Sequence, residues 1–241
     1  MLRSYFIVAF RNLYKNRFSS FINFAGLSIG MISFVVIGLY VIHEFSYDSY
    51  HQNAKNIFRV VKRIDTGKGS VKNLACGPAP LAPALIFEFP DMVTEVVRFY
   101  NYWGLGYNVQ FEKKIFHETS LVFTDPSVFN IFDFEFLEGK GETALQEPYS
   151  VVLSESMAVK YFGNNEPIGK SLRVEDSYEL QVTGIIKDLP TQSHFHFGFM
   201  VSFSTLNTLP WKSAVNSWED EFCYTYILLR HCSKINWHSL C

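Results

Sequence analysis

Two short segments place residue types that bind phosphates or metals at close spacing. The first is Gly163-Asn-Asn-Glu-Pro-Ile-Gly169-Lys170-Ser171, which is similar to a nucleotide phosphate-binding loop. In that motif the glycines are one residue closer together, and a strand precedes and a helix follows, so that backbone N–H groups converge on the phosphate. Here a helix pattern precedes the segment and a strand pattern follows it. We therefore interpret it as a turn with a solvated lysine rather than a nucleotide site.

The second segment is His194-x-His196, which would place two imidazoles on one face of a strand, as in some metal sites. No Cys, and no Asp or Glu nearer than Asp188, completes a set of ligands. The sequence also contains no HExxH motif. A structural or surface role is favoured, and we predict no catalytic, cofactor-binding or metal-binding residue and no enzyme.

The cysteines give no clear signal. They form no CxxC pair, and no His lies at zinc-finger spacing from them. Three of the four fall within the last nineteen residues, and an exported domain could oxidise them. The spacing defines no pairing, so no disulfide is predicted among Cys76, Cys223, Cys232 and Cys241.

The elements that would position these residues begin with an apolar segment. Residues 21–42 contain no charged side chain. At ~1.5 Å per residue a helix of this length spans roughly 33 Å, enough to cross a hydrocarbon core of ~30 Å. No second segment approaches 18 apolar residues. The sequence therefore predicts a single transmembrane helix at 21–42.

The flanks of this helix predict its orientation. Four Lys and Arg residues precede the helix, and the first acidic residue of the sequence is Glu44. Positive flanks remain in the cytoplasm, so we expect the N-terminus inside and residues 44–241 outside. A cleaved signal peptide is the alternative, but its apolar core would be shorter, ~7–15 residues. The four basic residues, which we expect at the membrane interface, are Arg3, Arg11, Lys15 and Arg17.

Residues 1–20 and the apolar segment each carry a further pattern. In residues 1–20 apolar side chains recur at helical spacing, which predicts an amphipathic helix at the cytoplasmic interface; a plain basic flank is the alternative.

Within the membrane helix, Gly26 and Gly30 form a GxxxG motif, and Ser33 extends the small face. Such a face lets a second helix approach closely, although glycine is common in membrane helices.

The exported part carries all 23 acids against 17 of the 21 Lys and Arg, a formal charge of −6. This charge argues against nucleic acid as a partner. Strand and helix patterns alternate without a regular βαβ period, so α+β is the predicted class. Predicted strands and helices include a helix at 81–88, a strand at 93–100, a helix at 126–132 with Asp125 as its N-cap, a helix from Ser154 to Phe162, and a two-faced strand at 193–203 with one aromatic side formed by Phe195, Phe197, Phe199 and Phe203.

Six segments in order resemble the FtsX/MacB-like permease family of ABC transporters. They are RNLYKNRFSSFINFAGLSIG (11–30), EFSYDSYHQNAKNIFRV (44–60), PAPLAPAL (78–85), DPSVFNIFDFEFLEG (125–139), VVLSESMAVKYFGNNEPIGK (151–170) and VTGIIKDLPTQSHFHFGFMVSF (182–203). The resemblance implies a first transmembrane helix followed by an extracytoplasmic MacB-like core domain of two α+β lobes.

The resemblance also implies a function and partners. Permeases of this family work with an ABC ATPase subunit and other permease copies in the bacterial inner membrane, and couple ATP hydrolysis to export or lipoprotein extraction. The sequence ends shortly after YTYILLR (224–230), before the family's later membrane helices, so we expect an incomplete core domain. A single-pass anchored binding or sensor module without transport activity is the alternative function.

Overall fold

The computed structural model describes residues 7, 11–45, 51–65, 71–101, 106–190, 192–210 and 212–230. The chain divides into two units, Met1–Tyr47 and Asp48–Cys241, and each is described by itself. The predicted α+β class, with an apolar helix ahead of a sheet-rich part, is confirmed.

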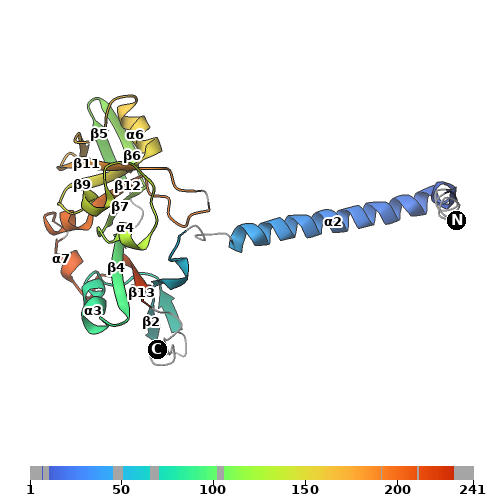
Figure 1. Cartoon of the computed structure of the whole chain (residues 1–241), viewed down its shortest axis with the longest axis horizontal. Coiled ribbons are helices and arrows are strands. Elements are labelled where there is room, and N and C mark those ends of the chain that lie inside the picture. Colours follow the sequence, from blue (N-terminus) through green and yellow to red (C-terminus); the bar gives the residue numbers. More distant parts are fainter. Residues whose placement is uncertain are drawn as a thin grey trace. The chain divides into compact units, whose positions relative to one another are not determined.

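The first unit contains the long helix α2, Arg17–Phe45 (Figure 1). It is the one helix among the described residues that is long and apolar enough to cross a membrane. None of its residues is buried, as expected for a helix that is apolar on all sides and has lipid as its solvent. Residues 11–15 are also helical, and a turn at Asn16 separates them from α2. Most of residues 1–10, and with them much of the predicted amphipathic helix, lie outside the described residues.

The second unit is built on a mixed sheet of eleven strands, in the order β1-β13-β4-β7-β12-β9-β11-β10-β5-β6, with β8 on β11. The β9–β11 and β7–β12 pairs are parallel, and the remaining pairs are antiparallel. A separate hairpin joins β2 and β3. The strands are β1 Ile57–Arg59, β2 Lys62–Asp65, β3 Val71–Leu74, β4 Val93–Tyr100, β5 Tyr107–Phe111, β6 Lys114–Glu118, β7 Leu121–Thr124, β8 Phe136–Glu138, β9 Ser150–Ser154, β10 Ser171–Val174, β11 Tyr178–Ile186, β12 Phe199–Ser202 and β13 Cys223–Leu229.

Short helices cover the sheet. Helix α3 packs against β4, and α6 packs against β9 and β11; Figure 1 shows the two helices at opposite ends of the unit. The helices are η1 Ala54–Asn56, α3 Leu81–Glu88, α4 Val128–Ile131, α5 Gly141–Ala144, α6 Glu155–Phe162, η2 Phe203–Asn207 and α7 Lys212–Asn216.

Helix α6 shows how local sequence sets these boundaries. The Ser154 hydroxyl accepts a hydrogen bond from the Met157 N–H (3.4 Å), which satisfies one of the unpaired donors of the first turn. The helix ends at Gly163, whose φ of 61° is a conformation that glycine adopts without strain. The predicted helix from Ser154 to Phe162 is therefore confirmed, together with its cap.

The hydrophobic core occupies both faces of the sheet. One large cluster contains Tyr100, Phe123, Tyr161 and Phe199, and a second contains Phe99, Phe132 and Phe195. A small third cluster lies between α3 and the ends of β4 and β13. Strand β4 pairs with both β7 and β13, which makes the sheet continuous through the second unit.

The predicted aromatic strand face at 193–203 is wrong. Phe195 and Phe197 pack in the second cluster, but Phe199 and Phe203 pack in the first, on the opposite face of the sheet. The change of side occurs at Gly198, where the N–H groups of Gly198 and Phe199 both donate to the Ser120 carbonyl (2.9 and 3.2 Å). Residues 193–198 are not part of a strand, since β12 begins only at Phe199, so their side chains do not continue its alternation.

Candidate functional site

The small face predicted in the membrane helix is present on α2. Gly26, Gly30 and Ser33 are spaced so that they lie on one face of the helix, and all three are exposed. A Cβ added at either glycine would meet nothing within 4 Å, so no contact inside the described chain explains these glycines. Their role as a face for another membrane helix remains a prediction.

The basic residues before the helix are only partly described. Arg11 and Lys15 are exposed on the helical segment that precedes Asn16, and Arg3 lies outside the described residues. Arg17 is the first residue of α2, and its guanidinium lies 5.5 Å from the centre of the Tyr14 ring. An interfacial role for these cations also remains a prediction.

The second unit has three adjoining hollows around the segment Leu74–Pro78 and strand β13. Their volumes are about 770, 350 and 320 Å³. The largest and the second share Ala75, Asn101 and Tyr224 in their walls, and we call these two together the β13 hollow. The segments that form it are distant in sequence and meet because β13 pairs with β4 and because Gly77 bridges to Cys223.

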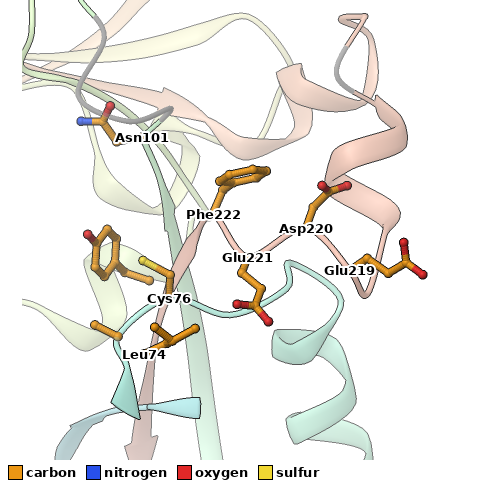
Figure 2. Close-up of a pocket in the computed structure, with 9 residues that line it drawn as sticks. Leu74, Cys76, Asn101, Glu219, Asp220, Glu221 and Phe222 are labelled. Carbon is orange, nitrogen blue, oxygen red and sulfur yellow. The ribbon is translucent and has the colours of Figure 1, made fainter. Parts of the chain in front are cut away.

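The β13 hollow has mainly apolar and aromatic walls. Leu74, Ala75, Phe222 and Tyr224 line its larger part, and Phe99, Phe197 and Tyr226 line its smaller part. Figure 2 shows the larger part, with Phe222 between Asn101 and the acidic residues in this view. A hydrogen bond with the side chain of Cys76 is the main reason that the pKa of the Tyr224 phenol is raised. Cys76 is partly exposed, whereas Cys223, the first residue of β13, is buried. Both are free thiols.

The polar groups of the β13 hollow are unevenly placed. Glu219, Asp220 and Glu221 line the larger part, and Glu221 forms an ion pair with Lys62. Arg59 and His194 line the smaller part. The Asn101 Oδ1 atom is buried and has no hydrogen-bond partner among the described residues. One end of the hollow is thus acidic.

The two motifs that sequence inspection singled out are separate from the β13 hollow or peripheral to it. The Gly163–Ser171 segment connects α6 to β10, so it has the helix before and the strand after, as predicted. Its lysine is not simply solvated: Lys170 is half-buried, and its Nζ lies 5.5 Å from the Phe162 ring centre and 5.8 Å from that of Phe111. His194 and His196 are exposed in a loop before β12, and no cluster of metal ligands occurs among the described residues.

Three polar clusters were not predicted from the sequence. The buried Glu118 carboxylate accepts hydrogen bonds from Lys160 Nζ (2.6 Å) and the Tyr161 hydroxyl (2.7 Å). Burial, followed by this hydrogen bond, raises the pKa of Tyr161. In the other two clusters Arg98 pairs with Asp125, and His51 with Asp133. Each joins segments far apart in sequence, so no local pattern marks it.

The His51 cluster fastens the start of the second unit to α4. His51 Nδ1 accepts from the Asp133 N–H (3.0 Å), and the Gln52 N–H donates to Asp133 Oδ2 (2.7 Å). The His51 ring lies edge-on to Phe132, with ring centres 5.1 Å apart. The chain is therefore fixed to the folded body only six residues after the last residue of α2, Phe45.

Residues 20–231 match the family model of the MacB-like periplasmic core domain. The chain belongs to this family. The match starts inside α2 and ends just after β13, so it includes most of the apolar helix and the whole described sheet. No curated protein matches the chain.

Solved structures of the MacB type share the fold. A domain of a protein described as a permease, from Porphyromonas gingivalis, has 21% identity and a TM-score of 0.65, covering 79% of this chain and 78% of that one. The periplasmic region of MacB from Actinobacillus actinomycetemcomitans has 14% identity and a TM-score of 0.55, with coverage of 81% and 80%. The extracellular domain of YknZ, a noncanonic ABC-type transporter of Gram-positive bacteria, has 15% identity and a TM-score of 0.53, with coverage of 75% and 87%. The expected resemblance to the MacB-like permease family is confirmed.

Proposed function

We propose that this chain is a permease subunit, or part of one, of an ABC transporter of the FtsX/MacB-like type. In this role the membrane helix α2 and the second unit relay conformational change driven by ATP hydrolysis in a partner ATPase. The output is export or the extraction of lipoproteins. The family match carries this proposal because it includes both the apolar helix and the domain that follows it.

The location follows from the same elements. We place α2 across the bacterial inner membrane, with the basic residues before it in the cytoplasm and the sheet-rich unit outside.

A second candidate function is a single-pass anchored binding or sensor module. The β13 hollow favours it, because a cavity of about 770 Å³ with aromatic walls is of the size that small ligands occupy. This alternative requires no ATPase.

Reporter fusions test the location. A reporter that is active only in the cytoplasm, fused after Val60, is expected to be silent, and alkaline phosphatase at the same position is expected to be active. The reverse pattern would place the second unit in the cytoplasm and contradict the proposal.

A labelling experiment separates the permease from the anchored module. Cys76 is partly exposed at the β13 hollow, so a membrane-impermeant maleimide reports on this region in native membranes. The two cysteines beyond residue 230 are replaced by serine, so that only Cys76 and the buried Cys223 remain. For a permease, the rate of Cys76 labelling changes when ATP or ATP with vanadate is supplied to the cytoplasmic side. A rate that is independent of ATP, in membranes that contain the neighbouring ATPase, favours the anchored module.

A further inference from the structure

The charge of the exported part is divided sharply along the chain. Residues 49–87 carry six Lys and Arg against one acid, Asp65, a formal charge of +5. The rest of residues 44–241 carries eleven Lys and Arg against 22 acids, a formal charge of −11. The six cations are Lys55, Arg59, Lys62, Arg63, Lys68 and Lys72. An anion approaching the exported part is therefore attracted to this segment and repelled by the remainder.

The described cations of this segment lie on consecutive elements at one edge of the second unit. Lys55 is on η1, and Arg59 is the last residue of β1, the outermost strand at this end of the main sheet. Arg63 and Lys72 lie on the β2–β3 hairpin, which begins two residues after β1 ends. Figure 1 shows β2 at the margin of the unit. We call Lys55, Arg59, Arg63 and Lys72 together the basic edge.

The charge of the basic edge is not neutralised by the described part of the chain. All four side chains are exposed. None of them forms an ion pair with another described residue, whereas Lys62 of the same segment pairs with Glu221. Four cations on adjoining elements are thus available to anions outside the chain.

Exposed apolar side chains lie among these cations. Val61 precedes β2 and is 51% exposed, and Val71 begins β3 and is 45% exposed. Cations beside exposed apolar side chains match the boundary between lipid headgroups and acyl chains, where phosphates attract the cations and the apolar groups leave water. An acidic protein surface would match the cations alone.

The connection to α2 keeps the basic edge close to lipid. Lys55 is ten residues after Phe45, the last residue of α2, so even a fully extended link spans at most ~36 Å. With α2 across a membrane, lipid headgroups are therefore held near this segment at a high effective concentration, which a separate soluble partner does not have.

We propose that the basic edge binds the anionic phospholipid headgroups of the membrane that α2 crosses. The assignment rests on the proposed function for the placement of α2 in the membrane. Binding of headgroups requires neither an ATPase nor transport, so the two proposals can fail separately.

The test uses a fluorescent probe on the hairpin of the full chain in lipid nanodiscs. The substitution Val71→Cys provides the attachment site for an NBD dye, whose emission rises when it leaves water. Cys76 and the two cysteines beyond residue 230 are replaced by serine, and Cys223 is buried. The nanodiscs contain phosphatidylcholine alone or with about 30% phosphatidylglycerol, and the anionic lipid is expected to raise the emission about twofold. Sodium chloride at about 0.5 M should abolish the rise, because it screens the attraction.

A second labelling position controls for general effects of the lipid. Val159 on α6 is also an exposed valine, at 60%, and lies outside the basic edge. A dye attached after Val159→Cys should show no rise with phosphatidylglycerol.

Charge substitutions locate the contact. Each basic side chain close to an anionic surface strengthens binding about fivefold, so Arg63→Gln with Lys72→Gln should remove most of the rise at position 71. The charge-retaining exchange Arg63→Lys with Lys72→Arg should keep it. The matched control, Lys113→Gln with Lys212→Gln, removes two exposed cations outside the basic edge and should leave the rise unchanged. Circular dichroism establishes that each variant is folded.

The outcomes separate lipid from other partners and this proposal from the permease function. Equal emission in the two lipids, or a rise that the Arg63 and Lys72 substitutions do not reduce, overturns the assignment. A rise in phosphatidylcholine alone that grows with nanodisc concentration identifies the acidic surface of another copy as the partner and also overturns it. A rise specific to phosphatidylglycerol with ATP-independent Cys76 labelling supports the basic edge and contradicts the permease function. ATP-dependent labelling without that rise does the reverse.

Discussion

The substitution Asp125→Asn should destabilise the second unit through the loss of one partly buried ion pair. The Arg98 side chain donates to both oxygens of Asp125, from Nε (2.8 Å) and Nη2 (2.7 Å), and the Arg98 backbone N–H donates to Oδ2 (2.9 Å). Both side chains are 19% exposed. The guanidinium also stacks on the Phe203 ring at 3.7 Å and donates to the Ala79 carbonyl (3.2 Å). The pair thus connects β4, the segment before α3, the segment before α4, and η2.

The size of the effect follows from this geometry. An asparagine retains one acceptor, but its NH₂ group faces the guanidinium donors, so about two charge-assisted hydrogen bonds are lost at ~1.5–3 kcal/mol each. Removing one partner of a fully buried pair costs about 3–5 kcal/mol, and partial exposure reduces this. We expect a loss of about 3 kcal/mol. For a unit of this size each kcal/mol lowers Tm by roughly 2–4 °C, which gives a decrease of about 6–12 °C.

The assay is thermal unfolding of the full chain in detergent, followed by near-ultraviolet circular dichroism, which reports on the packed aromatic core. Asp176→Asn is the control, because its pair with Arg173 has an N–O distance of 4.0 Å and both side chains are exposed, so Tm should change by less than about 1 °C. The double variant Arg98→Met/Asp125→Leu removes both charges and should recover part of the loss. A Tm for Asp125→Asn within about 1 °C of the native value would refute the reasoning.

Two further predictions concern the membrane helix and a buried thiol. Gly30→Ile should weaken association of α2 with another membrane helix, measured by a membrane association reporter, while Gly38→Ile, which is off the GxxxG stripe and also has open space, should not; equal effects would contradict the packing face. Burial raises the pKa of Cys223 from 9.0 to about 12, so above pH 9 the unfolded chain loses a proton that the folded chain retains. The free energy of unfolding should therefore fall between pH 9 and pH 12, and Cys223→Ala should flatten this fall in denaturant titrations; an unchanged slope would contradict it.

The elements with complete local signals were predicted from the sequence. Helix α3 and strand β4 have the predicted bounds, 81–88 and 93–100, because prolines and apolar runs delimit them. Helix α6 has both its N-cap and its terminal glycine in the sequence. The strand β9 was not predicted: all five of its residues are buried, so it shows no alternation of apolar and polar side chains.

Local signals fail where a distant partner competes. Asp125 followed by Pro126 has the pattern of a helix N-cap, and a helix does follow, but α4 begins at Val128 and Asp125 does not cap it. Its carboxylate is instead engaged by Arg98, because a bidentate bond to a guanidinium is stronger than a single bond to a backbone N–H. Ser127, next to the start of α4, likewise donates to the Val96 carbonyl (2.6 Å) rather than capping the helix. No pattern in the sequence identifies these partners in advance.

The β13 hollow is an extreme case of the same dependence on distant partners. Its walls come from Leu74–Cys76, from the residue after β4, and from the loop and strand at 219–226. They meet only because β13, at the end of the described chain, pairs with β4 over seven residues and accepts the bridge from Gly77. A strand register that slipped by one residue would turn Tyr224 away from the hollow and bring Cys223 into it. The shape of the hollow therefore depends on one long-range pairing, and any change that weakens β4–β13 pairing should alter the hollow before it unfolds the unit.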